Sequence, residues 1–291
     1  MHACCHQAPR SLLSRVVQGF STSFLVFFYQ IAFGGLVAIA GTPFHEIERA
    51  FYKSTAGVLY VIALLELWGE SSLWMQGILQ ASWATRLELI FHLIFVLAFS
   101  CYMASLWIEL PTFRARSFAT SILTGLAGLI LSAQRFYHAP LISLETLVYP
   151  SMFFVSALLL GSVTVGMLIG HWYLIDTGQS LDPFIRIYKF FVLSLVAQCA
   201  LFALFSVLLH FFGVPSTAEA MERLWRQHST LLVTRVIVGQ CAPLVLSWMI
   251  WRTLLIPHTM AATGLFYIAL LGVFVGEILG RQIIALTTLP F

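Results

Sequence analysis

The stretch PSMFFVSALLLGSVTVGMLIGHWYLI, residues 150–175, decides the fold of this chain. It contains no Asp, Glu, Lys or Arg, and it is longer than the roughly 20 apolar residues with which a helix crosses a bilayer. The surface of a soluble protein needs polar groups, whereas lipid accepts an apolar helix on every side. We therefore expect residues 150–175 to span a membrane.

The rest of the chain has the same character. Of its 291 residues, 60% are hydrophobic and only 9% are charged, and its mean hydropathy is +0.92. A soluble domain carries about 25% charged residues. The net charge of +3 is small and spread along the chain, which argues against nucleic-acid binding. Short connections leave no room for a catalytic domain outside the bilayer, and no nucleophile elbow, phosphate loop or HExxH sequence occurs.

Eight apolar runs are long enough to cross the bilayer, which predicts an all-α, multi-pass membrane protein of about eight transmembrane helices. We expect residues 1–18 to form an N-terminal tail and residues 19–291 to form a single transmembrane domain. The semi-polar segment from Ser71 to Thr85 predicts an interfacial segment or a short lateral helix. The eight runs cover residues 20–40, 50–68, 87–110, 117–134, 150–175, 184–212, 230–255 and 260–286.

The sequence leaves internal symmetry and orientation open. Phe27-Phe28 with Gly35 recurs as Phe153-Phe154 with Gly161 at a constant offset, which favours two related four-helix halves, 19–140 and 141–291, or arises by chance. Basic residues fall at both ends of the expected helices, so the positive-inside rule does not decide the orientation. Ala38-Ile39-Ala40 resembles a signal-peptidase site, but its run exceeds a signal core and we expect the helix to be retained.

The last apolar run carries two ionisable residues within Gly276-Glu277-Ile278-Leu279-Gly280-Arg281. Glu277 and Arg281 are four residues apart and therefore lie on one face of a helix. Ionisable groups at membrane depth are costly unless they are paired or functional. We expect a buried structural ion pair, or alternatively a group on a proton path or at a ligand site.

Histidines and acids also occur in other runs. Glu88 and His92 share a face of the third run, Glu66 lies near the end of the second, and His171 closes the fifth. A histidine near the membrane interface can hydrogen-bond a quinone and exchange protons, ligate haem, or simply bond a neighbouring carbonyl. No histidine pair is spaced for two stacked haems, and no Cys or His pattern fits a metal site. We therefore expect no metal or haem held by the chain itself.

Five short motifs follow one another along the chain. They are Gln30 with Gly34-Gly35, Gln134-Arg135-Phe136-Tyr137, Tyr149-Pro150-Ser151-Met152-Phe153-Phe154, Thr234-Arg235-Val236-Ile237 in a helix that closes on Pro257, and the Gly-Glu-x-x-Gly-Arg ending at residues 276–281. In this order they resemble the eight-helix membrane subunits of the NrfD/DmsC type. The ending is the most specific motif and is similar to that of the DMSO-reductase anchor branch.

The resemblance implies an anchor subunit, without activity alone, of a respiratory oxidoreductase complex in the bacterial cytoplasmic (inner) membrane. It implies electron exchange with a quinone, menaquinone or ubiquinone. Its partners would be an iron–sulfur ferredoxin-like subunit and a molybdopterin or multihaem subunit. The family has a His-Leu-Gly segment, associated with quinone, after its second helix, where this chain has Leu73-Trp74-Met75-Gln76-Gly77. The remaining candidates for a quinone site or proton path are His92, Glu66, Gln76, Glu88 and His171.

Two other functions stay open. The missing His-Leu-Gly segment favours a purely structural anchor whose quinone site is lost. Gly-rich helices and Pro243 are compatible with a small-solute or ion transporter. A transporter should have discontinuous helices around a site at the bilayer midplane. Glu277 and Arg281 lie toward the end of their helix, which weighs against that function.

Overall fold

The computed structural model describes residues 8–44, 46–77, 82–108, 110–137, 140, 143–176, 178, 180–256 and 258–291, with only the backbone of residues 8–18. The part of the chain so described is helical and contains no strand. Its elements are α1 (Ala8–Ala40), α2 (Arg49–Met75), α3 (Trp83–Ser105), α4 (Pro111–Gln134), α5 (Leu144–Ile175), α6 (Asp182–Phe212), α7 (Pro215–Gln227), α8 (Ser229–Val236), the π-turn η1 (Ile237–Cys241), α9 (Ala242–Leu254) and α10 (Thr259–Thr287).

Eight of these segments are long and apolar enough to cross a membrane, with α8, η1 and α9 forming one continuous span, Ser229–Leu254. The prediction of an all-α, multi-pass membrane protein is confirmed. The predicted end of the seventh span at Pro257 lies outside the described residues. The division into halves 19–140 and 141–291 stays a prediction.

Helix boundaries differ from the apolar runs because polar residues also form helix where the backbone continues. The helix α2 extends past Glu66 and Glu70 to Met75, so the first part of the predicted lateral segment belongs to a span. The helical backbone of α1 begins at Ala8, within the predicted tail. The amphipathic helix α7 is an additional element, which lies between the sixth and seventh apolar runs.

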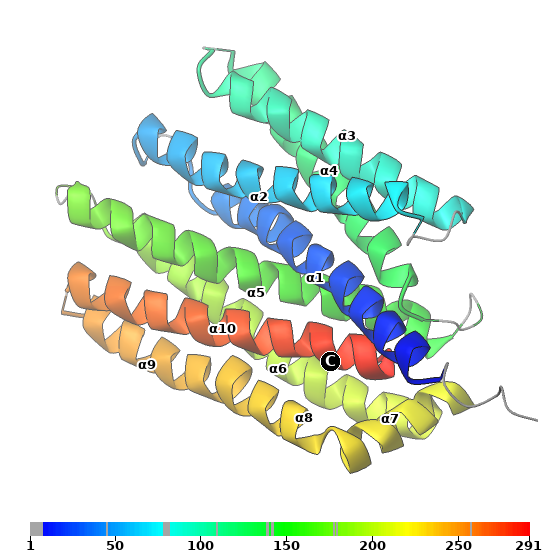
Figure 1. Cartoon of the computed structure of the whole chain (residues 1–291). Helices are drawn as coiled ribbons and strands as arrows, with labels where there is room; N and C mark the ends of the chain where they lie inside the picture. Colours follow the sequence, from blue (N-terminus) through cyan, green and yellow to red (C-terminus); the bar gives the residue numbers. More distant parts are fainter. Residues whose placement is uncertain are drawn as a thin grey trace, which may run out of the picture.

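Successive spans run up and down, so their connections alternate between two ends of the bundle (Figure 1). One end holds the start of α5, the C-terminal ends of α2, α4, α6 and α10, and the lateral helix α7. We call it the α7 end. The opposite end holds the connections α1–α2, α3–α4, α5–α6 and α9–α10.

The helices α1 and α5 form the centre of the bundle. In their most apolar windows 72% and 78% of residues are buried, against 39% or less in the other six spans. The two helices cross in very close contact, since a Cβ atom on Gly34 would lie 1.7 Å from the carbonyl oxygen of Ala157. The outer helices expose large apolar side chains such as Leu193, Val245 and Leu271, as a lipid-facing surface requires.

Candidate functional site

Six polar residues from three helices converge between α2, α3 and α4. Because the acids of α2 are four residues apart, as are Glu88 and His92 on α3, each helix points two polar groups at the same neighbour. The residue after α4 completes the group. We call it the His92 cluster, which consists of Glu66, Glu70, Glu88, His92, Ser132 and Arg135.

The contacts within the His92 cluster are short. Nδ1 of His92 lies 2.9 Å from Oε1 of Glu66 and 2.5 Å from Oε2 of Glu70. Arg135 donates from Nη2 to Glu70 at 2.6 Å and also to Glu88. The acids and the imidazole are at most 3% exposed, whereas the side chain of Arg135 is 17% exposed. The cluster therefore extends from the α7 end of the bundle into its interior.

The ring of His92 is held on both sides. Its Nε2 lies 3.1 Å from the hydroxyl of Ser132, and that hydroxyl donates to the carbonyl of Gly128 at 3.0 Å. With its single proton directed at Gly128, the Ser132 hydroxyl accepts from Nε2 of His92. Nδ1 is then bare when the ring is neutral and carries a proton when the ring is charged. The ring of Tyr29 stacks on the imidazole with centroids 4.1 Å apart. Gly128 leaves room for both, since a Cβ there would meet Tyr29 Oη at 2.3 Å.

A second polar group surrounds Glu277. This carboxylate accepts hydrogen bonds from Ser156 and Gln198 and lies 3.3 Å from Nη2 of both Arg235 and Arg281. The pair Glu277–Arg281 thus occupies the buried position that its spacing predicted. Arg281 also donates to Gln30 at 2.6 Å. We call these residues the Glu277 cluster, which consists of Gln30, Ser156, Gln198, Arg235, Glu277 and Arg281.

The Glu277 cluster explains the Gly-Glu-x-x-Gly-Arg ending in packing terms. Gly276 of α10 lies against Gly239 of the π-turn, where a Cβ on Gly276 would be 2.3 Å from the opposing Cα. Gly280 leaves room for Arg235, whose Nη1 would lie 1.3 Å from a Cβ at position 280. The cluster joins α1, α5, α6, α8 and α10 through hydrogen bonds and ion pairs among buried groups. Its geometry indicates a structural network.

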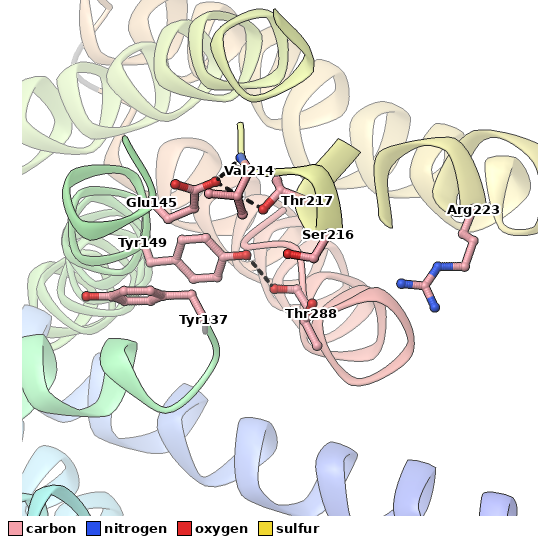
Figure 2. Close-up of a pocket in the computed structure, with 8 residues that line it drawn as sticks. All are labelled: Tyr137, Glu145, Tyr149, Val214, Ser216, Thr217, Arg223 and Thr288. Atoms are coloured by element: carbon pink, nitrogen blue, oxygen red, sulfur yellow. Dashed lines mark hydrogen bonds between the residues drawn. The ribbon is translucent and has the colours of Figure 1, made fainter. Parts of the chain in front are cut away.

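A cavity of about 220 Å³ opens at the α7 end, between the starts of α5 and α7 and the end of α10 (Figure 2). Glu145 accepts hydrogen bonds from the Val214 backbone N–H at 2.8 Å and the Thr217 hydroxyl at 3.1 Å, and so ties the start of α7 to α5. Tyr149 donates to the carbonyl of Thr288 at 2.8 Å. The residues that line this α7 cavity are Tyr137, Glu145, Tyr149, Val214, Ser216, Thr217, Arg223 and Thr288.

Aromatic and donor groups are both available in the α7 cavity. Figure 2 shows the rings of Tyr137 and Tyr149 side by side, with Arg223 standing apart at the edge. The two ring centroids are 5.0 Å apart. Within the described part of the chain, the hydroxyls of Tyr137 and Ser216 make no hydrogen bond, and Oε2 of Glu145 is buried without one.

The structure brings together only some of the sequence-predicted site residues. Glu66, Glu88 and His92 lie in one cluster. Gln76 caps the end of α2, where it is exposed and apart from that cluster. His171 lies near the opposite end of the bundle, exposed, with Nδ1 3.4 Å from the hydroxyl of Tyr267. The fifth-run histidine therefore shares no site with His92.

Sequence reasoning missed three contributors. Glu70 looks in the sequence like a polar residue that only crowds the end of a helix, although its spacing of four from Glu66 places both on one face. Arg135 entered only through the resemblance, and its pairing with two acids depends on how α4 packs. No sequence pattern marked Glu145 as a site residue, because its hydrogen-bond partners Val214 and Thr217 lie far away in the sequence.

Comparison with family models, with characterised proteins and with solved structures found no match. The likeness to the NrfD/DmsC type therefore depends on the short motifs in the sequence.

Proposed function

We propose that this chain is the membrane subunit of a respiratory oxidoreductase complex that exchanges electrons with a quinone bound in the α7 cavity. The observation that carries the proposal is the short segment from Arg135 to Tyr137. Arg135 is fixed by Glu70 and Glu88 of the buried His92 cluster, and Tyr137, two residues later, lines the cavity. An ionised cluster inside the bundle thereby positions an aromatic wall of a pocket at its end.

The α7 cavity has the groups that a quinone ring needs. Quinone carbonyls accept hydrogen bonds, and the hydroxyls of Tyr137 and Ser216 are available donors. The paired tyrosine rings offer a flat aromatic surface. The volume of about 220 Å³ is below the roughly 300–1,000 Å³ of sites for larger ligands, which favours a single ring system with its tail outside.

The other side of α7 suits an apolar tail. A groove of about 350 Å³ lies between α6, α7 and α8, and its lining is almost entirely apolar, with Phe202, Leu224 and Trp225 among its residues. Such a groove buries apolar area in proportion to the length of chain it takes up. A prenylated quinone combines a polar ring with an apolar chain, and the region around α7 offers a surface for each.

The reaction balances with two electrons and two protons, which convert the quinone to the quinol. In this proposal the electrons come from or go to an iron–sulfur ferredoxin-like partner docked at the α7 end, with a molybdopterin or multihaem subunit beyond it. Glu145 lines the cavity and has an unbonded oxygen, so it is our candidate for exchanging protons with the bound ring. The protein would lie in the bacterial inner membrane and use menaquinone or ubiquinone.

The test is binding of a short-tail photoreactive quinone to the purified chain. We expect labelling of peptides that contain Tyr137 or α7. The variants Tyr137→Phe and Ser216→Ala should each weaken binding about fivefold, the value of one hydrogen bond of about 1 kcal/mol. Tyr267→Phe, a matched tyrosine at the opposite end, should bind as the wild type does. Saturable binding that is equal in all four proteins, or no binding at all, would refute this site.

One observation favours the transporter alternative. The seventh span contains the π-turn η1, which ends directly before the Ala242-Pro243 step. Gly239 of this turn faces Gly276, next to Glu277. The acid therefore lies opposite a local irregularity in a continuous helix, and π-turns are frequent at functional sites. Proton or cation flux in proteoliposomes that contain this chain alone would support transport. A structural anchor would show neither flux nor quinone binding.

A further inference from the structure

We propose that the His92 cluster is a binding site for one divalent transition-metal ion inside the membrane, with Glu66, Glu70 and His92 as its ligands. One atom from each of these side chains lies within 4.8 Å of the other two, and all three residues are buried. His92 lies about 14 Å along α3 from Trp83, so the site is well inside the span. This inference is independent of the quinone proposal, which concerns the α7 cavity.

The protonation of the imidazole provides the first argument. Because Nε2 of His92 donates to Ser132, the neutral ring presents a bare lone pair at Nδ1. That lone pair faces carboxylate oxygens of Glu66 and Glu70, and neither contact has the geometry of a hydrogen bond. Three electron-rich atoms pointing at one another repel unless a positive charge lies among them. A proton on Nδ1 or a metal ion supplies that charge, and the metal ion uses the same lone pairs.

The charge balance provides the second argument. Three carboxylates and one guanidinium leave the cluster at −2 when the imidazole is neutral. A net charge of this size cannot persist away from water. One divalent cation restores neutrality, provided that Nδ1 of His92 and Oε2 of Glu70, 2.5 Å apart, separate to the roughly 3.3 Å between two ligands of one tetrahedral metal ion.

Buried orphan atoms provide the third argument. Within the described residues, five atoms of the His92 cluster are buried and have no hydrogen-bond partner. Oε2 of Glu66, Oε2 of Glu70 and Nδ1 of His92 belong to the proposed ligands, and Oε1 of Glu88 and Nε of Arg135 lie beside them. Most buried polar side-chain atoms in proteins have such a partner, so a group of them in one place needs an explanation. Coordination to a metal ion satisfies the ligand atoms among them.

The groups around the ligands are those that support metal sites. Histidine ligands usually donate their second ring nitrogen to a neighbouring group, as His92 does to Ser132. Ligating carboxylates are themselves hydrogen-bonded, as Glu70 is to Arg135. One imidazole with two carboxylates suits Zn²⁺, Mn²⁺ or Fe²⁺, because Mg²⁺ and Ca²⁺ prefer oxygen ligands alone.

The metal ion would join α2 to α3. No sequence pattern announced the site, because its ligands are divided between a pair on α2 and one residue on α3. The expectation of no metal at His92 is based on the spacing of ligands along the sequence. Such spacing does not reveal a set of ligands that comes from two helices.

The test is metal analysis of the full chain, purified in detergent without chelators. We expect about one Zn, Mn or Fe per chain in the wild type, and less than a tenth of that in His92→Gln. His171→Gln, the matched change at an exposed histidine, should keep the metal. Equal metal content in the wild type and His92→Gln would overturn the proposal.

A second measurement does not depend on a variant that folds. The wild type is stripped with a chelator and titrated with Co²⁺ alone, whose visible absorption reports nitrogen and oxygen ligands. We expect saturation at one Co²⁺ per chain and displacement by Zn²⁺. The absence of saturable binding would mean that protons neutralise the cluster instead, and would overturn the proposal. Quinone binding to the α7 cavity should survive either result, so this proposal and the proposed function can fail separately.

Discussion

The sharpest prediction concerns Gly280, which makes room for Arg235. A Cβ at position 280 would lie 1.3 Å from Nη1 of Arg235, 2.5 Å from its Cζ and 3.0 Å from the carbonyl oxygen of Phe291. In Gly280→Ala the guanidinium must therefore move by about 2 Å, more than a normal van der Waals contact can absorb. At that displacement it loses its contact with Glu277, now 3.3 Å.

The cost follows from what the displaced charge loses. A hydrogen bond to a charged group is worth about 1.5–3 kcal/mol, and breaking a buried ion pair costs about 3–5 kcal/mol. We expect Gly280→Ala to lower the free energy of unfolding by about 2–5 kcal/mol. Gly264→Ala on the same helix has nothing within 4 Å of its Cβ. It should instead stabilise the protein by about 0.5–1 kcal/mol, the helix preference of alanine over glycine.

The assay is unfolding in mixed micelles by increasing mole fraction of sodium dodecyl sulfate, followed by tryptophan fluorescence. The background Arg235→Met separates the clash from any general intolerance of position 280, because methionine removes the guanidinium. In that background Gly280→Ala should cost less than about 1 kcal/mol. The reasoning is refuted if Gly280→Ala is as stable as Gly264→Ala, or if its cost is the same with and without Arg235.

Four further substitutions test the fold, the His92 cluster and the α7 cavity. Gly34→Ala should prevent folding, because its Cβ would lie 1.7 Å from the backbone oxygen of Ala157, and size-exclusion chromatography should show only aggregate. Glu70→Gln and Arg135→Met should each cost about 3–5 kcal/mol, but less than the sum when combined, which a double-mutant cycle in mixed micelles measures; strict additivity would contradict direct pairing. Glu145→Ala removes the two hydrogen bonds that tie the start of α7 to α5 and about 1 kcal/mol, so limited proteolysis within α7 should become about fivefold faster, and an unchanged rate would contradict this role.

The sequence was sufficient to predict where the helices lie, but not which helices pack against one another. Hydropathy located all eight spans, since a run such as residues 150–175 has no alternative to lipid or a fully buried site. It failed at α2, where the apolar signal stops near Glu66 although the helix continues to Met75. The backbone N–H and C=O groups of a helix bond to one another whatever the side chains are. A drop in hydropathy therefore does not mark the end of a helix.

The polar site was predictable in part. The cost of burying ionisable groups is enough to mark Glu66, Glu88 and His92 as unusual within their apolar runs. That cost does not say which groups meet, because α2, α3 and α4 contribute from positions more than 60 residues apart, such as Glu70 and Arg135. A proline within a helix disturbs its hydrogen bonds, and the structure has a π-turn that ends just before Pro243. The position of a π-turn depends on the packing of Gly239, which hydropathy does not record.

The bond between Gln30 and Arg281 joins α1 to α10, which is synthesised about 250 residues later. The partners of the His92 cluster, by contrast, all lie before residue 136, so that group can assemble while the ribosome is still translating the second half. Until α10 enters the bilayer, Gln30 on α1 has a side-chain oxygen without its partner, and Arg235 lacks its counter-ion. A nascent chain stalled before Glu277 would therefore expose an unpaired arginine to lipid, which makes it a natural substrate for membrane quality-control proteases.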